Sequence, residues 1–155
     1  MDPDSPWLTE QQQRVWRAWL AMSRQLPAAL QGQLQEDADL SLQDFDVLVQ
    51  LTETTVGKVR VSDLAKSLSW ERSRLSHHIR RMEGRGLVNR EECPDDGRGA
   101  FVVLLPKGRD AIEHAAAAHA LTVRHLFFDG LNDLDLETLD ALASNVLSRL
   151  ETVDS

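Results

Sequence analysis

The chain has 155 residues, of which 42% are hydrophobic and 27% charged, and its net charge is −8. This length allows one compact domain with a real core, with or without helical extensions. No run of eighteen apolar residues exists and there is a single cysteine, Cys93, which excludes a transmembrane helix and an internal disulfide framework.

The first half of the chain is predicted to be mainly helical. Apolar residues recur at helical spacing between residues 7 and 34. Pro27 is expected to bend or interrupt this helix, because it lacks a backbone donor. Ser41 is a suitable N-cap for a second helix. The β-branched stretch 56–61 predicts a short strand, and Ser62 is expected to cap a third helix of about two turns.

An arginine-rich helix and a hairpin are predicted next. The helix should begin near residue 71, with Ser69 as the best candidate for its cap, and should end at two glycines, Gly84 and Gly86. Residues 87–92 and 101–105 are predicted strands, separated by a turn-rich segment that contains Asp-Gly. This pattern is typical of two strands joined by a protruding hairpin loop.

Two further helices are predicted at the C-terminal side. Pro106 is well placed as the first residue of a helix over about 106–130, and a last helix is predicted over about 135–151. The complete order predicts a mainly α protein with a small β-wing. This is a winged helix-turn-helix with long N- and C-terminal helices, whose apolar faces need a partner.

Positive charge is concentrated in one part of the chain. Between Lys58 and Arg109 there are twelve Lys and Arg against seven Asp and Glu, whereas the remainder has five against eighteen. A basic block within an acidic chain points to a polyanion that is bound through one surface only. On charge alone, a solvated helix face explains the block equally well.

The arginine-rich helix separates its charge from its apolar residues. On a helical wheel of about 100° per residue, Leu75, Ile79 and Met82 define the buried stripe, with His78 and Arg72 at its edge and partly exposed. A helix that enters the major groove needs hydrogen-bond donors on its outer face. The residues expected to contact DNA are Ser73, Arg74, Ser76, His77, Arg80 and Arg81.

The tip of the hairpin is a second expected DNA contact. Arg98 suits the narrow minor groove, where the negative potential is enhanced. Asp96 lies too close to phosphate for a direct contact, so its expected role is to hold Arg98 or to shape the turn. The alternative is an Asp-Gly turn without any DNA contact.

Three stretches follow one another in a distinctive order: "LSLQDFDVLVQL", "VSDLAKSLSWERSRLSHHIRRMEGRGLVNR", and "DGR" followed by "VVLLPKGR". Together they resemble the MarR family of bacterial transcription regulators over about residues 40–110. The resemblance implies a homodimer that binds a pseudopalindromic operator through two recognition helices, here residues 71–85, and two wings. The chain departs from the family at Leu105, where a threonine is usual, and at the pair His77 and His78.

The resemblance also implies an organisation and a form of control. Residues 1–36 and 106–155 would be dimerisation helices, and residues 37–105 the DNA-binding lobe of a single intertwined domain. Family members often respond to small aromatic acids bound between these parts, which suggests a repressor released by a small ligand. Candidate pocket residues are Trp16, Trp19 and Met22, although an aromatic stripe on a helix more often forms core, here that of the dimer.

Two alternative functions have weaker support. Cys93 would allow a redox-responsive regulator, but Glu91 and Glu92 disfavour the reactive thiolate, an effect that nearby arginines would offset. The second alternative is a winged-helix module that binds a protein partner without binding DNA; the intact basic face argues against it.

Other sites and compartments have little support. The histidines at positions 114, 119 and 125 are not spaced three or four apart as ligands on a helix require, so no metal site is expected. The absence of a G-x-S-x-G elbow leaves nothing in favour of an enzyme, and no cofactor is expected. The acidic N-terminus is unlike a secretory signal, and the reducing cytoplasm is the expected compartment.

Overall fold

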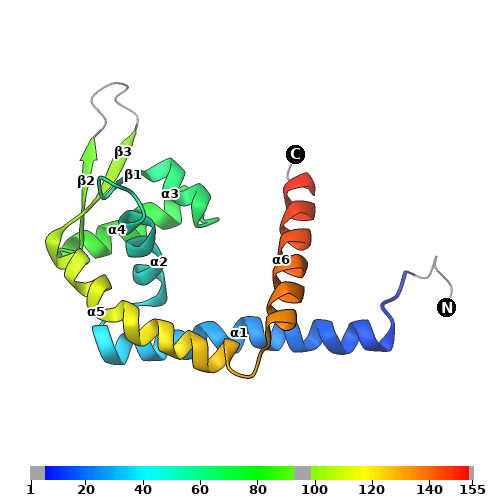
Figure 1. Ribbon diagram of the computed structural model, residues 1–155. Coiled ribbons are helices and arrows are strands. Elements are labelled where there is room, and N and C mark those ends of the chain that lie inside the picture. The colour runs from blue at the N-terminus through cyan, green and yellow to red at the C-terminus, as the bar shows by residue number, and fades with distance from the viewer. Residues whose placement is uncertain (1–5, 93–98, 154–155) are drawn as a thin grey trace. The chain divides into compact units, whose positions relative to one another are not determined.

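The computed structural model describes residues 6–92 and 99–153. They form two compact units, and the boundary between the units falls after Thr122, in the last turn of the helix that ends at Val123. The first unit contains α1 (Glu10–Ala38), α2 (Leu42–Thr52), β1 (Lys58–Arg60), α3 (Val61–Ser67), α4 (Arg72–Gly84), β2 (Val88–Glu92), β3 (Ala100–Leu104) and α5 (Pro106–Val123) (Figure 1). The second contains one π-helical turn (Arg124–Phe128) and α6 (Asp133–Val153). The predicted fold class, mainly α with a small β-wing, is confirmed.

The N-terminal helix α1 begins with a capping box. Thr9 Oγ1 accepts a hydrogen bond from the Gln12 backbone N–H at 3.2 Å, and Gln12 Oε1 accepts one from the Thr9 N–H at 2.8 Å. The helix continues through Pro27, so the proline does not interrupt it. It ends at Asp39, whose φ of 52° is left-handed, a conformation typical of helix C-termini.

Ser41 caps α2 as predicted. Its Oγ accepts from the Asp44 N–H at 2.9 Å, and Asp44 Oδ2 accepts from the Ser41 N–H at 2.9 Å. These two bonds satisfy backbone donors that the first turn of a helix leaves without partners. They also hold the Asp44 carboxylate at the junction between α1 and α2.

Two predicted caps are wrong. The helix α3 begins at Val61, directly after β1, and its N-cap is Arg60, which makes no side-chain cap bond. Arg60 already has the extended backbone that an N-cap requires, so Ser62 lies inside the first turn. Ser69 has a left-handed φ of 53° and forms the tight turn before α4, whose N-cap is Glu71.

The predicted hairpin is present, and β1 joins it to form a sheet. The strand order is β1-β3-β2 with antiparallel pairing, and Val102 in the central strand lies opposite both Val59 and Arg90. Val102 is fully buried and packs with the core that α2, α3 and α4 share. Figure 1 shows the described ends of β2 and β3 reaching past α3 and α4.

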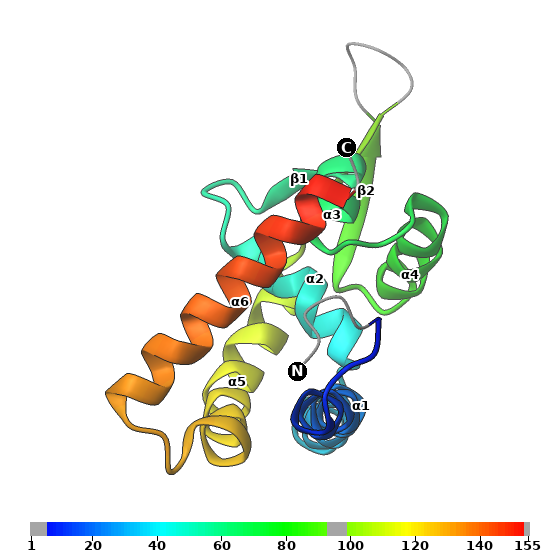
Figure 2. The same cartoon turned by 90° about the vertical axis from the view of Figure 1, so that its right-hand side faces the viewer.

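The helix α5 starts at Pro106 as predicted and packs back onto the N-terminal helices. His119 lies 4.3 Å from the Phe45 ring, centroid to centroid, and its Nδ1 is 3.2 Å from Gln33 Oε1 on α1. Burial lowers the pKa of His119. Figure 2 shows α1 end-on, with α2 between it and the hairpin.

The second unit is helical and buries little of its own surface. The α-helix predicted to reach residue 130 ends at Val123, because the chain widens into a π-helical turn over Arg124–Phe128. None of the residues of α6 is buried, and Leu142, Val146 and Leu150 are each about half exposed. In the part of the chain that the structure describes, no helix is long and apolar enough to cross a membrane.

Candidate nucleic-acid interface

The apolar stripe of α4 is the one that the sequence predicts. Leu75, Ile79 and Met82 are completely buried and belong to the single hydrophobic core of the first unit. Since this stripe fixes the rotation of the helix, the opposite side of α4 must face outwards.

Most of the predicted DNA-contacting side chains of α4 lie on that outer face. The exposed residues are Ser73, Arg74, His77, Arg80 and Arg81, and Ser76 is half-buried. They cover about two and a half turns of one helix, and three of them are arginines. A helix that carries this many donors on one face has the chemistry that phosphates and guanine edges require.

The structure corrects the prediction for His78, which is buried and only 6% exposed. The Trp70 ring lies edge-on to it, with centroids 5.5 Å apart and planes at 90°. On the other side, Asp44 Oδ1 from α2 is 3.0 Å from His78 Nε2. A helical wheel of α4 places His78 at the edge of the stripe. It cannot predict the burial of His78, because Trp70 and Asp44 lie outside this helix.

Two arginines of the outer face are held by neighbouring side chains. The guanidinium of Arg74 lies over the Trp70 ring at 4.7 Å, a cation–π contact. Arg81 Nη2 lies 2.8 Å from His78 Nδ1. A free arginine side chain carries about 2 kcal/mol of rotamer entropy. Contacts such as these restrict the side chain beforehand, so less of that entropy is lost when the arginine binds a ligand.

Asp44 is the buried charge behind this face. Burial alone would raise its pKa, but the His78 ring, the Ser41 N–H and the Arg85 guanidinium together outweigh burial and hold the pKa of Asp44 well below its usual range. Arg85 Nη1 lies 2.6 Å from Asp44 Oδ2, and the same guanidinium donates to the Asp39 carbonyl. The carboxylate therefore ties the end of α4 to the start of α2.

We expect Asp44→Asn to lower the free energy of unfolding by about 2 kcal/mol at neutral pH, because the charge opposite Arg85 is lost while the shape is kept. The lowered pKa means that the carboxylate stabilises the fold above the pKa of the unfolded chain, about 3.9. That stability is lost as the pH falls through the folded value.

Urea titrations from about pH 6 to about pH 2 test this expectation. The wild-type chain should lose more stability than Asp44→Asn in the acid range, so that the two curves converge. The exposed Asp110→Asn is the matched control and should run parallel to the wild type. Parallel curves for wild type and Asp44→Asn would contradict the assignment.

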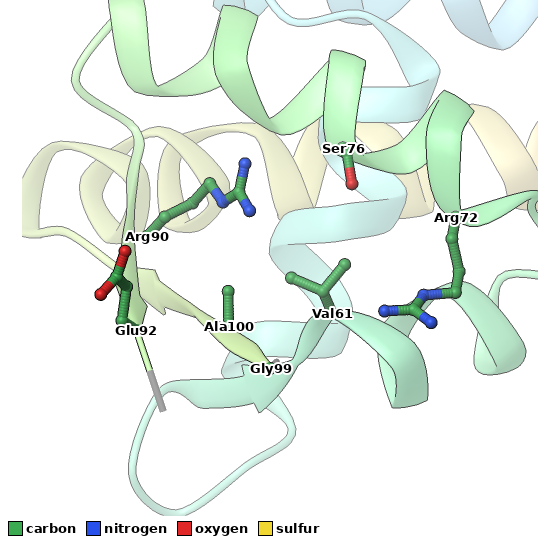
Figure 3. A pocket seen from close by; sticks show the side chains of 7 residues that line it. All are labelled: Val61, Arg72, Ser76, Arg90, Glu92, Gly99 and Ala100. Carbon is green, nitrogen blue, oxygen red and sulfur yellow. The ribbon is translucent and has the colours of Figure 1, made fainter. Parts of the chain in front are cut away.

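A hollow of about 240 Å³ separates α4 from the wing (Figure 3). Figure 3 shows the guanidinium groups of Arg72 and Arg90 entering it from opposite sides, with Ser76 above and Glu92 at the rim. Two guanidiniums and a hydroxyl in one hollow suit an anion, although Glu92 reduces the positive potential there.

Arg72 and Arg90 are not among the DNA-contacting residues predicted from the sequence. A signal for Arg90 exists in the alternation of β2, since residues two apart share a face of a strand. Val88 is buried, so Arg90 points to the same side, toward α4. The signal for Arg72 is weaker, because the wheel places it only at the edge of the apolar stripe.

Cys93, Asp96 and Arg98 lie outside the described residues, so their predicted roles stay predictions. Among the described residues, no group of three or more His, Cys, Asp or Glu side chains is placed to hold a metal ion.

The predicted ligand-pocket residues lie on the N-terminal half of α1. Trp16 is 53% and Trp19 47% exposed, and Met22 is half-buried. A second hollow, of about 340 Å³, lies between the α1–α2 junction and α4, and its lining includes Asp44, His78, Arg81 and Arg85. Trp16, Trp19 and Met22 line neither of these two hollows, and their role in a ligand pocket stays a prediction.

Known proteins of similar sequence and structure identify the family of this chain. The sequence model of the MarR family matches residues 40–99. AbsC, a MarR family transcriptional regulator from Streptomyces coelicolor, is 38% identical; the alignment covers 96% of this chain and 99% of AbsC, with a TM-score of 0.90. This chain belongs to the MarR family. It is therefore a DNA-binding transcription regulator by family, and its fold is that of regulators rather than of enzymes.

Two other transcriptional regulators are similar to this chain. Sco3205, also from Streptomyces coelicolor and solved in complex with DNA, is 36% identical over 94% of this chain and 92% of its own, with a TM-score of 0.90. An uncharacterized HTH-type transcriptional regulator from Bacillus subtilis (strain 168), YdgJ, is 32% identical over 56 residues. That match spans 36% of this chain and only 34% of the curated relative.

Proposed function

We propose that this MarR family member is a homodimeric repressor that binds a pseudopalindromic operator and leaves it when a small aromatic ligand binds. The observation that carries the DNA-binding part is the outer face of α4, where Arg74, Arg80 and Arg81 are exposed opposite a fully buried stripe. The acidic remainder of the chain repels DNA and so restricts docking to this face.

Within this proposal the outer face divides into base-reading and phosphate-binding residues. His77 lies opposite the buried stripe and would read base edges in the major groove, together with Ser73 and Ser76. Arg80 and Arg81 flank that line and would bind phosphates. Arg72 and Arg90 would hold a further phosphate in the hollow beside the wing.

The wing would make the minor-groove contact. Arg98 would enter the groove and Asp96 would orient it or shape the turn, as proposed from the sequence. Replacing Arg98 with Ala should weaken operator binding by more than about tenfold with little change in melting temperature, since the sequence predicts a hairpin tip there and such a position should contribute little to folding. Fluorescence anisotropy and calorimetry of the same variant test both halves of this expectation.

The dimer is proposed from the apolar side chains that a single chain leaves in water. Trp16 and Trp19 on α1 and Leu142, Val146 and Leu150 on α6 are all about half exposed. Burying such side chains stabilises a protein by about 1.5 to 3 kcal/mol each. We propose that residues 1–36 and 106–155 supply the dimer interface and residues 37–105 the DNA-binding lobe. In this view Trp16, Trp19 and Met22 pack in the interface or line the ligand pocket beside it.

Sedimentation at micromolar concentration should therefore show a particle of twice 17.4 kDa. Leu142→Asp should shift it toward a monomer or an unfolded chain, because an unpaired charge in an apolar interface costs several kcal/mol. Glu151→Asp, a change that keeps the charge on the same helix, is the control. A stable, fully folded wild-type monomer would contradict the proposed dimer.

Selection of binding sites from random-sequence DNA tests the proposed function. A homodimer with two recognition helices should enrich an inverted repeat whose half-sites lie one helical turn apart, about 10 bp centre to centre. No enrichment would favour the alternative of a protein-binding winged helix. Enriched DNA that is released by oxidant in the wild type, but not in Cys93→Ser, would favour the redox alternative.

A further inference from the structure

His78 is a buried histidine in the middle of a helix whose other polar residues face outwards. It cannot reach DNA itself, because only 6% of its surface is accessible. The edge of the Trp70 ring and the Asp44 carboxylate cover it. A buried imidazole with two polar nitrogens costs free energy unless those atoms find partners, so its presence here calls for a physical reason.

The hydrogen bond to Arg81 determines which nitrogen of the neutral His78 ring carries the proton. A guanidinium has five N–H donors and no acceptor. Because Arg81 Nη2 lies 2.8 Å from His78 Nδ1, Nδ1 must accept, which leaves the proton of a neutral ring on Nε2. Nε2 is buried and, among the described residues, has no well-aligned hydrogen-bond partner; the Asp44 oxygen 3.0 Å away favours the proton at that nitrogen.

The Asp44 side chain is held firmly in place beside His78. Its carboxylate is fixed by the Ser41 N–H at one side and by Arg85 at the other, at 2.9 and 2.6 Å. The side chains of Asp44, His78 and Arg81 thus form a row that leads from the α2 cap to the exposed face of α4. Only one donor of Arg81 is used in this row, and four remain for a phosphate.

We infer that His78 is a positioning residue for DNA binding, whose Nδ1 holds the Arg81 guanidinium ready for a backbone phosphate. This inference rests on the proposed phosphate-binding role of Arg81. Ordering a free arginine side chain on binding weakens the complex, and a side chain that is ordered beforehand avoids much of that loss. In the proposed dimer, each of the two Arg81 side chains would lose less entropy on binding DNA.

Two substitutions separate the two nitrogens of the ring. The amide oxygen of Asn occupies about the position of Nδ1, so His78→Asn keeps an acceptor for Arg81. The longer Gln places its amide near Nε2, so His78→Gln keeps a donor toward Asp44 and loses the acceptor. We expect His78→Gln to weaken binding about tenfold to the selected operator and to random DNA alike, and His78→Asn to stay within about threefold of the wild type.

A double-mutant cycle with Arg81→Ala distinguishes positioning from a general loss of structure. If His78 acts through Arg81, His78→Gln has no further effect on DNA binding in the Arg81→Ala background. An additive tenfold loss there, or tighter binding by His78→Gln alone, overturns the inference. If Arg81→Ala itself leaves binding unchanged, the proposed role of Arg81 fails, which is a different outcome from additivity.

A measurement on the wild-type chain keeps the inference testable if the variants do not fold. Nitrogen-15 NMR of the imidazole should show the His78 ring as the neutral tautomer protonated at Nε2, with an acceptor signature at Nδ1. The tautomer protonated at Nδ1 overturns the inference, because that nitrogen then cannot accept from Arg81.

Discussion

Replacing Arg80 and Arg81 together with Ala should weaken binding to the selected operator at least about a hundredfold. A hydrogen bond to a charged group contributes about 1.5 to 3 kcal/mol, and a dimer loses two such arginines in each half-site. Each phosphate contact also releases counterions, with a slope of about 0.9 per contact on B-DNA. Removing four contacts should therefore flatten the dependence of log K on log salt by about three to four units.

The double variant Arg14→Ala and Arg24→Ala is the matched control. It removes the same number of positive charges from exposed positions of α1, away from the outer face of α4. Because residues 1–36 belong to the proposed dimer interface, sedimentation of this variant must first show the particle size of the wild type. Anisotropy titrations over a salt series should give the control nearly the wild-type slope. Equal effects of the two double variants would mean that net charge, and not the face of α4, determines binding.

Replacing Gly108 with Ala should destabilise the first unit by about 3 kcal/mol or more, at the upper end of the range for overpacked sites. A Cβ at this position would lie 2.1 Å from the Leu87 carbonyl oxygen and 2.9 Å from Leu104 Cδ1. The same carbonyl accepts from the Leu105 N–H at 3.1 Å, so moving it breaks a bond between the sheet and the start of α5. The melting temperature should fall by about 6 to 12 °C.

Gly32→Ala on α1 is the control for this experiment, because nothing lies within 4 Å of a Cβ added there. Alanine in an exposed helix interior stabilises by about 0.5 to 1 kcal/mol relative to glycine. The two variants should thus change the melting temperature in opposite directions. A Gly108→Ala variant as stable as the wild type would show that α5 does not pack tightly against the strand entry at Leu87.

Features set by neighbours in the sequence could be predicted. Ser41 caps α2, Pro106 opens α5, and the stripe of Leu75, Ile79 and Met82 is buried, because each depends on spacing within one turn or one helix. The predicted caps Ser62 and Ser69 are wrong for a local reason too. The strand β1 runs straight into α3, so Arg60 supplies the extended N-cap without a serine. Ser69 has a left-handed backbone, whereas an N-cap needs an extended one.

Features set by distant parts of the chain could not be predicted. Asp44 meets His78 and Arg85 only because α2 packs on α4, and no pattern within either helix reports this. The burial of His78 follows from that packing, and so does its contact with Arg81. The hollow with Arg72 and Arg90 likewise exists only once the wing lies against α4.

The specificity ratio of His77→Ala tests most directly whether the outer face of α4 reads bases. Titrations of the selected operator and of random DNA, each over a salt series, give this ratio for the variant and the wild type. The ratio should fall, because the difference in binding free energy between the two DNAs shrinks by about 1 to 3 kcal/mol per half-site. The salt slope should stay within about half a unit of the wild-type value. An unchanged ratio with a flatter slope would place His77 on the phosphate backbone and would contradict the proposed orientation of the helix in the groove.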